Sequence, residues 1–275
     1  MAIITISHQM GSGGPEIGMG LGQRLGYRYV DQELIQDAVR RYGLAEEKAS
    51  HLDESKPTLF ERFDVETRHY ITVLQTTLLE FAERDGAILM GRGGVWLLRG
   101  IPHVLRVRVI GPFEQRVKSW IKRSAEVAGE TPNQRSATDF VRRDDTEKSG
   151  RMRYLYEVDI DDASLYDLVI NTEKLPYQAA VEMIEAVVRR PEMATTASGR
   201  EVVASRVLAS QVQVALATNP ETRRYRITVE ARSGIVVLEG TAGLDRAVEV
   251  ARQVPGVREV RTQQVEIPPI PPFVA

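Results

Sequence analysis

Residues 3–18, IITISHQMGSGGPEIG, decide the fold class, because a buried apolar run leads directly into a cluster of glycines and then into a helical pattern. A glycine-rich turn between a strand and a helix lets successive backbone N–H groups converge on one point. The N-terminus of the helix adds about half a positive charge. Such a turn can hold a phosphate without any side chain. A plain strand-to-helix turn also favours glycine, and the loop alone supports both interpretations equally.

The loop lacks one residue that phosphate-binding loops of the P-loop type carry. In those loops the last glycine is followed by a lysine and then by a hydroxyl residue. The corresponding positions here are Gly14 and Pro15, and Glu16 comes next. An acid in the first turn suits the helix dipole, yet it would repel a bound phosphate. The stretch therefore raises the question of what supplies the missing positive charge.

Composition excludes several classes of function. The 275 residues, 43% of them hydrophobic, suffice for one large or two smaller domains, and a net charge of -2 argues against a general nucleic-acid binder. The absence of cysteine excludes a disulfide scaffold, a thiolate zinc site and a cysteine nucleophile, and the four histidines share no metal-ligand spacing. No N-terminal signal pattern and no apolar stretch of about 18 residues occur, so we expect a cytoplasmic protein without a transmembrane segment.

The first 190 residues alternate short apolar runs with longer amphipathic ones. This alternation implies a parallel sheet with helices on both faces. The apolar runs predict strands at Ile3–Ser7, Tyr27–Val30, Ala87–Gly91, Val104–Ile110 and Leu168–Asn171. The amphipathic runs predict helices at 15–25, 33–42, 58–84, 113–127, 134–155 and 176–190.

A second module follows a short linker. Periodicity stops at 191–200, PEMATTASGR, and small polar residues predominate there. Residues 201–267 then predict a helix, a hairpin that turns at Ser233-Gly234, a second helix and a last strand, which is a small α+β arrangement. The tail 268–275 is rich in proline and predicts extended chain.

Charged residues at predicted strand ends favour an anion site. Asp31 ends the second strand, and Arg92 ends the third beside glycines that leave the backbone accessible. A surface arginine in a turn is the alternative for Arg92. Arginines and lysines also gather in 116–153. Mobile cations over an active site neutralise charge in phosphoryl transfer, and this cluster is a candidate for that role. The alternative is a solvated surface, because runs of charge on helices more often face water.

Three segments, in this order, resemble the cytidylate kinase-like family of P-loop nucleoside monophosphate kinases. They are residues 3–35, ILMGRGG (88–94) and DDASLYDLVINTEKLPYQAAVEMI (161–184). The resemblance covers about residues 1–190 and implies an α/β fold, a P-loop nucleoside monophosphate kinase-like parallel five-stranded sheet flanked by helices. It also implies transfer of the terminal phosphoryl group of ATP to CMP or dCMP, with Mg²⁺, by a protein that closes a lid over these small-molecule nucleotides.

The resemblance also implies roles for individual residues. The donor phosphates would be held by Gly11, Ser12, Gly13, Gly14, Arg116 and Arg123. The acceptor would be bound by Asp31, Arg92 and Asp145. Catalytic arginines would be Arg92, Arg143 and Arg151, and no residue is assigned as a metal ligand.

The departures from the family pattern keep other functions open. Loss of a lysine that contacts the β- and γ-phosphates removes on the order of a few kcal/mol of transition-state stabilisation. Binding would survive on backbone donors while turnover falls, unless an arginine of 116–153 replaces the lysine. The alternatives are a catalytically weakened nucleotide sensor and an adaptor in which the kinase-like fold is a scaffold.

The C-terminal module resembles the BON domain in its helix, in ITVEARSGIVVLEGTA (227–242 within the hairpin) and in VPGVREV (254–260). BON modules are linked to phospholipid surfaces and to small-ligand or protein partners. This resemblance implies a localising or regulatory role for the module, whereas a small packing domain without a ligand remains the alternative.

Overall fold

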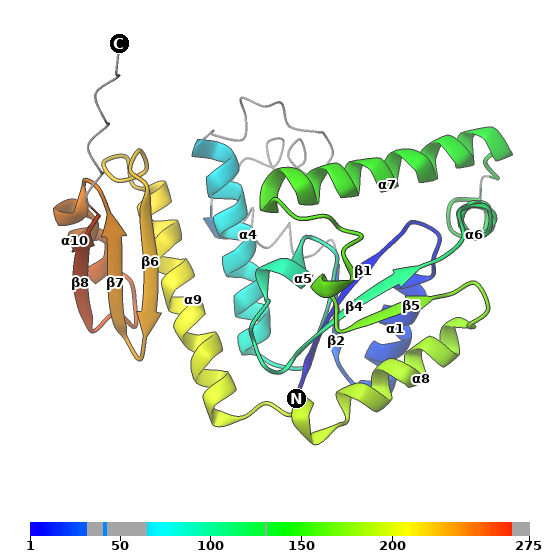
Figure 1. Cartoon of the computed structure of the whole chain (residues 1–275), viewed down its shortest axis with the longest axis horizontal. Coiled ribbons are helices and arrows are strands. Elements are labelled where there is room, and N and C mark those ends of the chain that lie inside the picture. Colours follow the sequence, from blue (N-terminus) through cyan, green and yellow to red (C-terminus); the bar gives the residue numbers. More distant parts are fainter. Residues whose placement is uncertain (32–40, 43–64, 130, 266–275) are drawn as a thin grey trace, which may run out of the picture.

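The computed structural model describes residues 1–31, 41–42, 65–129 and 131–265 (Figure 1). Its larger part contains a five-stranded sheet in the order β2-β3-β1-β4-β5, in which every pairing is parallel. The predicted α/β class is therefore confirmed, and each strand lies within one residue of its predicted bounds. The strands are β1 (Ile3–His8), β2 (Arg28–Val30), β3 (Ala87–Met90), β4 (Val104–Ile110) and β5 (Leu168–Asn171).

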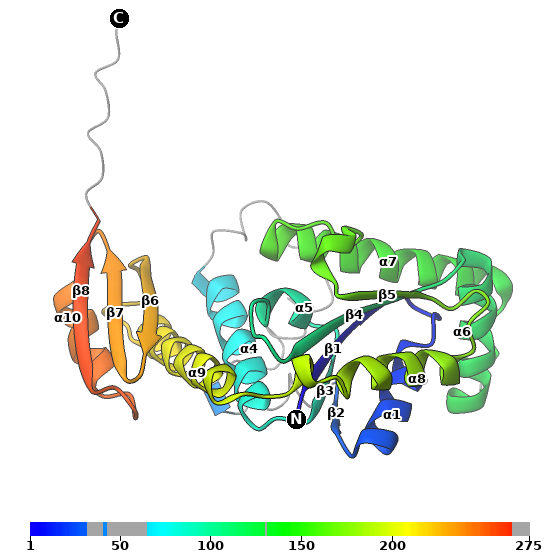
Figure 2. The same cartoon turned by 60° about the horizontal axis from the view of Figure 1, so that its bottom comes forward.

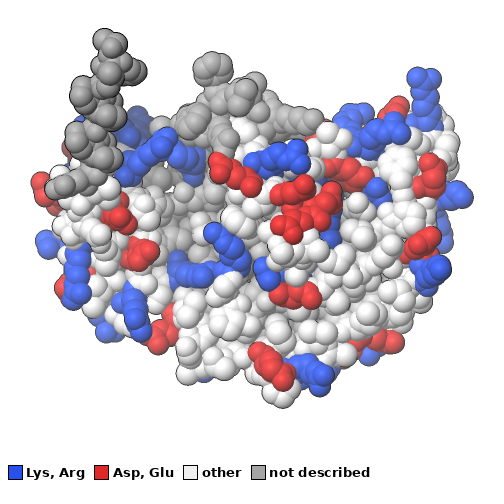
Figure 3. Space-filling view, in the orientation of Figure 1, with Lys and Arg blue, Asp and Glu red and all other residues white. Residues whose placement is uncertain are grey.

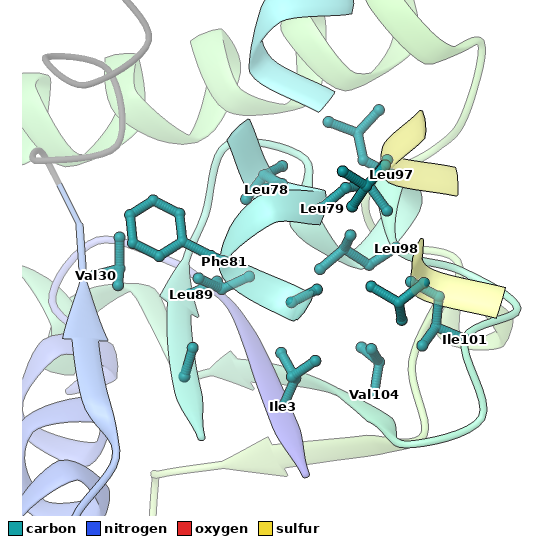
Figure 4. Close-up of a cluster of buried hydrophobic side chains, with 14 of the residues drawn as sticks. Ile3, Val30, Leu78, Leu79, Phe81, Leu89, Leu97, Leu98, Ile101 and Val104 are labelled. Carbon is teal, nitrogen blue, oxygen red and sulfur yellow. The ribbon is translucent and has the colours of Figure 1, made fainter. Parts of the chain in front are cut away.

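Helices cover both faces of this sheet. Side chains of β1 alternate between two buried clusters, because successive strand residues point to opposite faces. Ile4 and Ile6 pack with α1 (Gly14–Leu25) and α8 (Tyr177–Val188). On the other face, a cluster that includes Ile3 and Leu78 packs against α4 (Val65–Glu83) and α5 (Gly94–Leu97), as Figure 4 shows.

Two further helices lie at the carboxyl end of the sheet. They are α6 (Phe113–Ala128) and α7 (Gln134–Tyr156), each within one residue of its prediction, and α7 extends across this end in Figure 1. The start of the helix predicted at 58–84 and most of the one predicted at 33–42 fall outside the described residues. The short helix α5 was not predicted, because glycines before it indicated a turn.

The C-terminal module is a three-stranded sheet with two helices. Its strands are in the order β6-β7-β8, with β7 antiparallel to β6 and parallel to β8. The predicted α+β arrangement and the hairpin turn at Ser233-Gly234 are confirmed. The elements are α9 (Ala197–Thr218), β6 (Ile227–Arg232), β7 (Ile235–Gly240), α10 (Leu244–Arg252) and β8 (Glu259–Gln264).

Helix α9 begins earlier than predicted and joins the two parts of the molecule. Thr196 caps it, since its Oγ1 accepts a hydrogen bond of 3.0 Å from the Gly199 N–H, so the end of the predicted linker is helical. Helices α4 and α9 lie side by side in Figures 1 and 2. Val203 and Val207 of α9 belong to the same buried cluster as Leu78 of α4. The two modules therefore share apolar packing.

The surface charge is mixed. Lysine and arginine side chains are interspersed with aspartate and glutamate over the face in Figure 3, in keeping with a net charge of -2. Among the helices that the structure describes, none is both long and apolar enough to traverse a bilayer.

Candidate functional site

The glycine cluster forms a tight loop between β1 and α1, at the carboxyl end of the sheet. Gly11 and Gly13 adopt φ angles of 78° and 88°, which side-chain-bearing residues rarely adopt. Ser12 is buried, and its hydroxyl donates to the carbonyl oxygens of Gln9 (2.8 Å) and Val109 (3.1 Å). The structure thus brings the four predicted loop residues together, with the Ser12 side chain holding the loop to β4.

The loop leaves backbone donors at the start of α1. The first hydrogen bond within the helix runs from the Ile17 N–H to the Gly13 carbonyl, at 3.0 Å. The N–H groups of Gly13, Gly14 and Glu16 therefore have no helical acceptor, and Pro15 has no N–H. Such a helix terminus is a favourable place for an anion.

His8 occupies the space that a side chain at position 14 would need. A Cβ added to Gly14 would lie 2.3 Å from Cγ of His8, well inside van der Waals contact. Burial and the nearby Lys148 lower the pKa of the His8 imidazole to about 3, so the ring is neutral near pH 7. An uncharged ring from the preceding strand therefore fills the space that a lysine side chain at position 14 would need.

A lysine of α7 approaches the loop where β1 ends. The Lys148 ammonium donates to the His8 carbonyl at 3.3 Å and pairs with Asp144 at 3.0 Å. Its side chain is 30% exposed, so part of it faces solvent. Sequence reasoning looked for an arginine in 116–153 and missed this lysine, although its spacing of one helical turn from Asp144 was visible.

Arg116 and Asp145 form a buried support under the loop. The Arg116 guanidinium donates to the carbonyls of Gly111 (3.0 Å) and Met10 (3.1 Å). It also forms a bidentate pair with Asp145, at 3.1 and 2.7 Å. The side chain of Arg116 is 5% exposed. Both predicted site residues are thus brought to the loop, where they contact each other and the backbone.

Arg123 resolves the electrostatic conflict at Glu16. Its guanidinium pairs with the Glu16 carboxylate at 3.1 Å, so the acid in the first turn of α1 is compensated. A pocket of about 250 Å³ opens here. It is lined by residues that include Met10, Gly11, Gly13, Trp120, Arg123 and Tyr177.

The acceptor residues predicted from the strand ends lie along the same edge of the sheet. Arg92 follows β3 and has a φ of 55°, a left-handed conformation that costs about 1 to 2 kcal/mol in a residue with a side chain. The Tyr156 ring packs on Gly93, because a Cβ there would lie 2.7 Å from it. Burial raises the pKa of the Tyr156 hydroxyl, and the positive charge of the nearby Arg151 opposes this rise. The end of α7 thus brings Arg151 towards the loop of Arg92.

Asp31 follows β2 on this edge. Burial, and then the Asp31 charge, raise the pKa of the Tyr29 hydroxyl to about 12, with a smaller contribution from Glu16. The charges of Asp31 and Glu16 both act on the Tyr29 hydroxyl. Arg143, by contrast, is exposed on α7 and does not line the pocket among the described residues.

Two further residues contact this site, and sequence reasoning missed the first of them. Arg108 in β4 is 4% exposed and donates to the Ser7 hydroxyl at 2.8 Å and to Asp161 at 3.1 Å. Thr172 after β5 donates to the carbonyl of Ser12 at 3.0 Å. Arg108 was hidden in an apolar strand pattern, and only the register of the sheet places it beside β1. The described residues contain no group of three or more histidine, aspartate or glutamate side chains placed to hold a metal ion.

Comparisons with known proteins agree with this geometry. The family model of the cytidylate kinase-like family matches residues 3–174, and that of the BON domain matches residues 205–269. A cytidylate kinase of Thermococcus kodakarensis is 27% identical over 173 residues, covering 62% of this chain and 79% of that protein. A cytidylate kinase of Staphylothermus marinus is 27% identical over 191 residues, covering 69% of this chain and 98% of that protein.

A solved structure shares the fold of the larger module. The crystal structure of an uncharacterized protein from Eubacterium ventriosum has a TM-score of 0.54 to this chain at 20% identity. The match covers 68% of this chain and 97% of that one. At this identity the likeness shows the fold alone.

Proposed function

The chain belongs to the cytidylate kinase-like family and carries a C-terminal BON domain, and we propose that it transfers the terminal phosphoryl group of ATP to CMP or dCMP. The observation that carries this proposal is the glycine loop at the start of α1, which Lys148 of α7 approaches through its hydrogen bond to the His8 carbonyl. The similarity to the relatives supports the reaction class, and the choice of acceptor base rests on those relatives being cytidylate kinases.

In this proposal the donor phosphates lie against the backbone N–H groups at the start of α1. Lys148 supplies the positive charge that Gly14 does not, because its ammonium already lies at hydrogen-bond distance from the carbonyl of His8. A cation placed where negative charge develops is typically worth 10²- to 10³-fold in rate. Arg116 and Asp145 act as positioning residues, since both are engaged with each other under the loop.

The acceptor phosphate contacts Arg92 and Arg151 at the neighbouring strand end. The left-handed backbone of Arg92 supports this role, since strain of this kind concentrates at functional sites. A guanidinium matches a phosphate group in a bidentate manner, which orients the acceptor for attack. A catalytic role for Arg143 stays a prediction from the family resemblance.

Glu16 and Asp31, whose charges both act on Tyr29, are the carboxylates that would hold magnesium. Mg²⁺ is usually bound by one or two carboxylates together with substrate phosphates, and Glu16 and Asp31 are the groups available here. When bound, the ion neutralises charge on the β- and γ-phosphates. Pro15 cannot supply the hydroxyl ligand of a standard P-loop.

The test is phosphoryl transfer by the purified full-length chain. ADP release with ATP, Mg²⁺ and each nucleoside monophosphate in turn should occur with CMP or dCMP. Arg92→Ala should reduce kcat/KM for the acceptor at least 100-fold, while Arg99→Ala, an exposed control that stacks on Trp96, changes it less than threefold. Absence of ADP release with every monophosphate, in Mg²⁺ or Mn²⁺, would refute the proposal.

A nucleotide sensor without turnover is the second candidate. The observation that favours it is the His8 ring in the space of the missing lysine side chain. Isothermal titration separates the two candidates, because a sensor binds ATP, ADP or CMP with normal saturation but releases no ADP. A chain that binds none of these nucleotides would contradict both.

A further inference from the structure

A second hollow lies between the two modules, and its residues are distant in sequence from the glycine loop. It has a volume of about 400 Å³ and is formed by α4 on one side and by the end of α9 with the start of β6 on the other. We call it the interdomain groove. Its polar lining includes Arg68, His69, Thr72, Gln213, Arg223 and Arg226.

The groove carries positive charge without acidic partners. Its three arginines come from both modules, Arg68 from α4 and Arg223 and Arg226 from the second module. Among the residues that the structure describes, no aspartate or glutamate lines the groove, and none forms an ion pair with these three guanidinium groups. Three like charges around one hollow repel one another, and a bound anion would relieve that repulsion.

Uncharged hydrogen-bonding groups complete the lining. The amide of Gln213 and the hydroxyl of Thr228 line the groove, and neither side chain donates or accepts a hydrogen bond within the described part of the chain. His69 also lines it, and its Nε2 atom is buried with no hydrogen-bond partner there. A buried ring nitrogen without a partner is costly in a folded protein.

The wall of the groove is held in place before any ligand binds. Thr222 is 1% exposed, and its hydroxyl donates to the Leu216 carbonyl at 2.7 Å, which closes the end of α9. Leu216 and Ile227 are buried in the core of the second module and present apolar surface to the groove. Tyr225 stands beside them, with the Arg224 guanidinium 4.8 Å from its ring centroid. A fixed wall reduces the entropy lost on binding.

We propose that the interdomain groove binds a phosphate group, held by the guanidinium groups of Arg68, Arg223 and Arg226 and by His69. Guanidinium groups match phosphate oxygens in geometry and charge, and the absence of carboxylates in the described lining favours a dianion over a neutral ligand. The phosphate group belongs either to a soluble phosphorylated molecule or to a lipid headgroup. Because its ligands come from both modules, the bound group also strengthens their contact.

The experiment is isothermal titration of the full-length chain with inorganic pyrophosphate. The test variant is Arg223→Ala/Arg226→Ala, and the matched control is Arg232→Ala/Arg252→Ala, which removes two exposed arginines of the same module away from the groove. We expect the test variant to lose at least tenfold in affinity for pyrophosphate, and the control to stay within twofold of the wild type. Arg68→Ala should reproduce the loss from the other side of the groove.

A second arm distinguishes the source of the phosphate group. The same proteins are sedimented with vesicles of phosphatidylcholine containing phosphatidic acid. Binding to vesicles that the test variant loses and the control keeps supports a lipid headgroup, whereas a difference only with pyrophosphate supports a soluble ligand. If neither probe separates the two variants, the proposal is wrong, because any remaining binding then lies elsewhere, for example at the glycine loop.

Discussion

The pocket at the glycine loop and the interdomain groove both contain cations, but only the first pairs them with acids. In the loop pocket Arg123 pairs with Glu16 at 3.1 Å and Lys122 with Glu126 at 3.9 Å. Behind it, Arg116 holds Asp145 in a bidentate pair. In the groove, Arg68, Arg223 and Arg226 have no such partner among the described residues.

The difference indicates two ways in which cations can interact with a bound anion. At the loop, acids hold the cations in fixed positions, so charge is placed accurately and its net value stays low, which suits a reaction centre. In the groove, the attraction comes from charge that has not been compensated, which suits simple binding and is weakened by salt.

The largest expected effect follows removal of the acid beneath the loop. Asp145→Ala leaves the buried Arg116 without its carboxylate, and loss of one partner of a buried pair costs about 3 kcal/mol of unfolding free energy. Urea denaturation measures this difference. Asp139→Ala, an exposed residue of the same helix, should stay within about 0.5 kcal/mol of the wild type. Equal stability of the two variants would mean that the pair does not support the loop.

A smaller effect is expected when the missing lysine is restored. Gly14→Lys forces a side chain into the space of His8 and should cost about 2 kcal/mol of stability by overpacking, without raising turnover. Gln23→Lys, on the exposed face of α1, adds the same charge and should be neutral. The double variant His8→Gly/Gly14→Lys should recover part of the loss. A single variant that is both stable and more active would show that His8 does not fill this space.

A third effect concerns pH, and it compares one histidine from each hollow. Burial lowers the pKa of both His8 and His69 in the folded state, to about 3 for His8. As the pH falls, the histidines of the unfolded chain take up protons before those of the folded protein. The stability that the neutral buried rings contribute is therefore present above pH 6.5 and is lost as the pH falls towards their folded-state pKa. Melting temperatures between pH 7 and 4 should fall less steeply in His8→Gln than in the wild type, with a weaker change in His69→Gln. Parallel curves for all three proteins would contradict the buried neutral state.

The fold was predictable because its signals are local. Alternating apolar and amphipathic runs placed the five strands, and the glycine cluster placed the start of α1. The early start of α9 was missed because small polar residues around Thr196 indicate a linker as readily as a helix cap. Only the packing of α9 on α4 decides between the two.

The site was predictable only in outline. The strand ends identified Asp31 and Arg92, and the loop identified Gly11 to Gly14, because position along the chain fixes where these residues lie. The partners of each cation depend on contacts between distant segments. Arg123 with Glu16 and Lys148 with the His8 carbonyl could not be seen in the sequence. The groove could not be seen in the sequence for the same reason, since Arg68 lies 155 positions before Arg223.

The central claim is that Lys148 takes the part of the missing loop lysine. The direct test is kcat for ATP-dependent phosphorylation of CMP or dCMP by the wild type, Lys148→Ala and Lys122→Ala, the last being an exposed lysine that lines the pocket at the glycine loop. We predict a fall of about 100-fold for Lys148→Ala and less than threefold for Lys122→Ala, with both variants folded. Equal rates for the two variants, or a wild type without turnover, would contradict the claim.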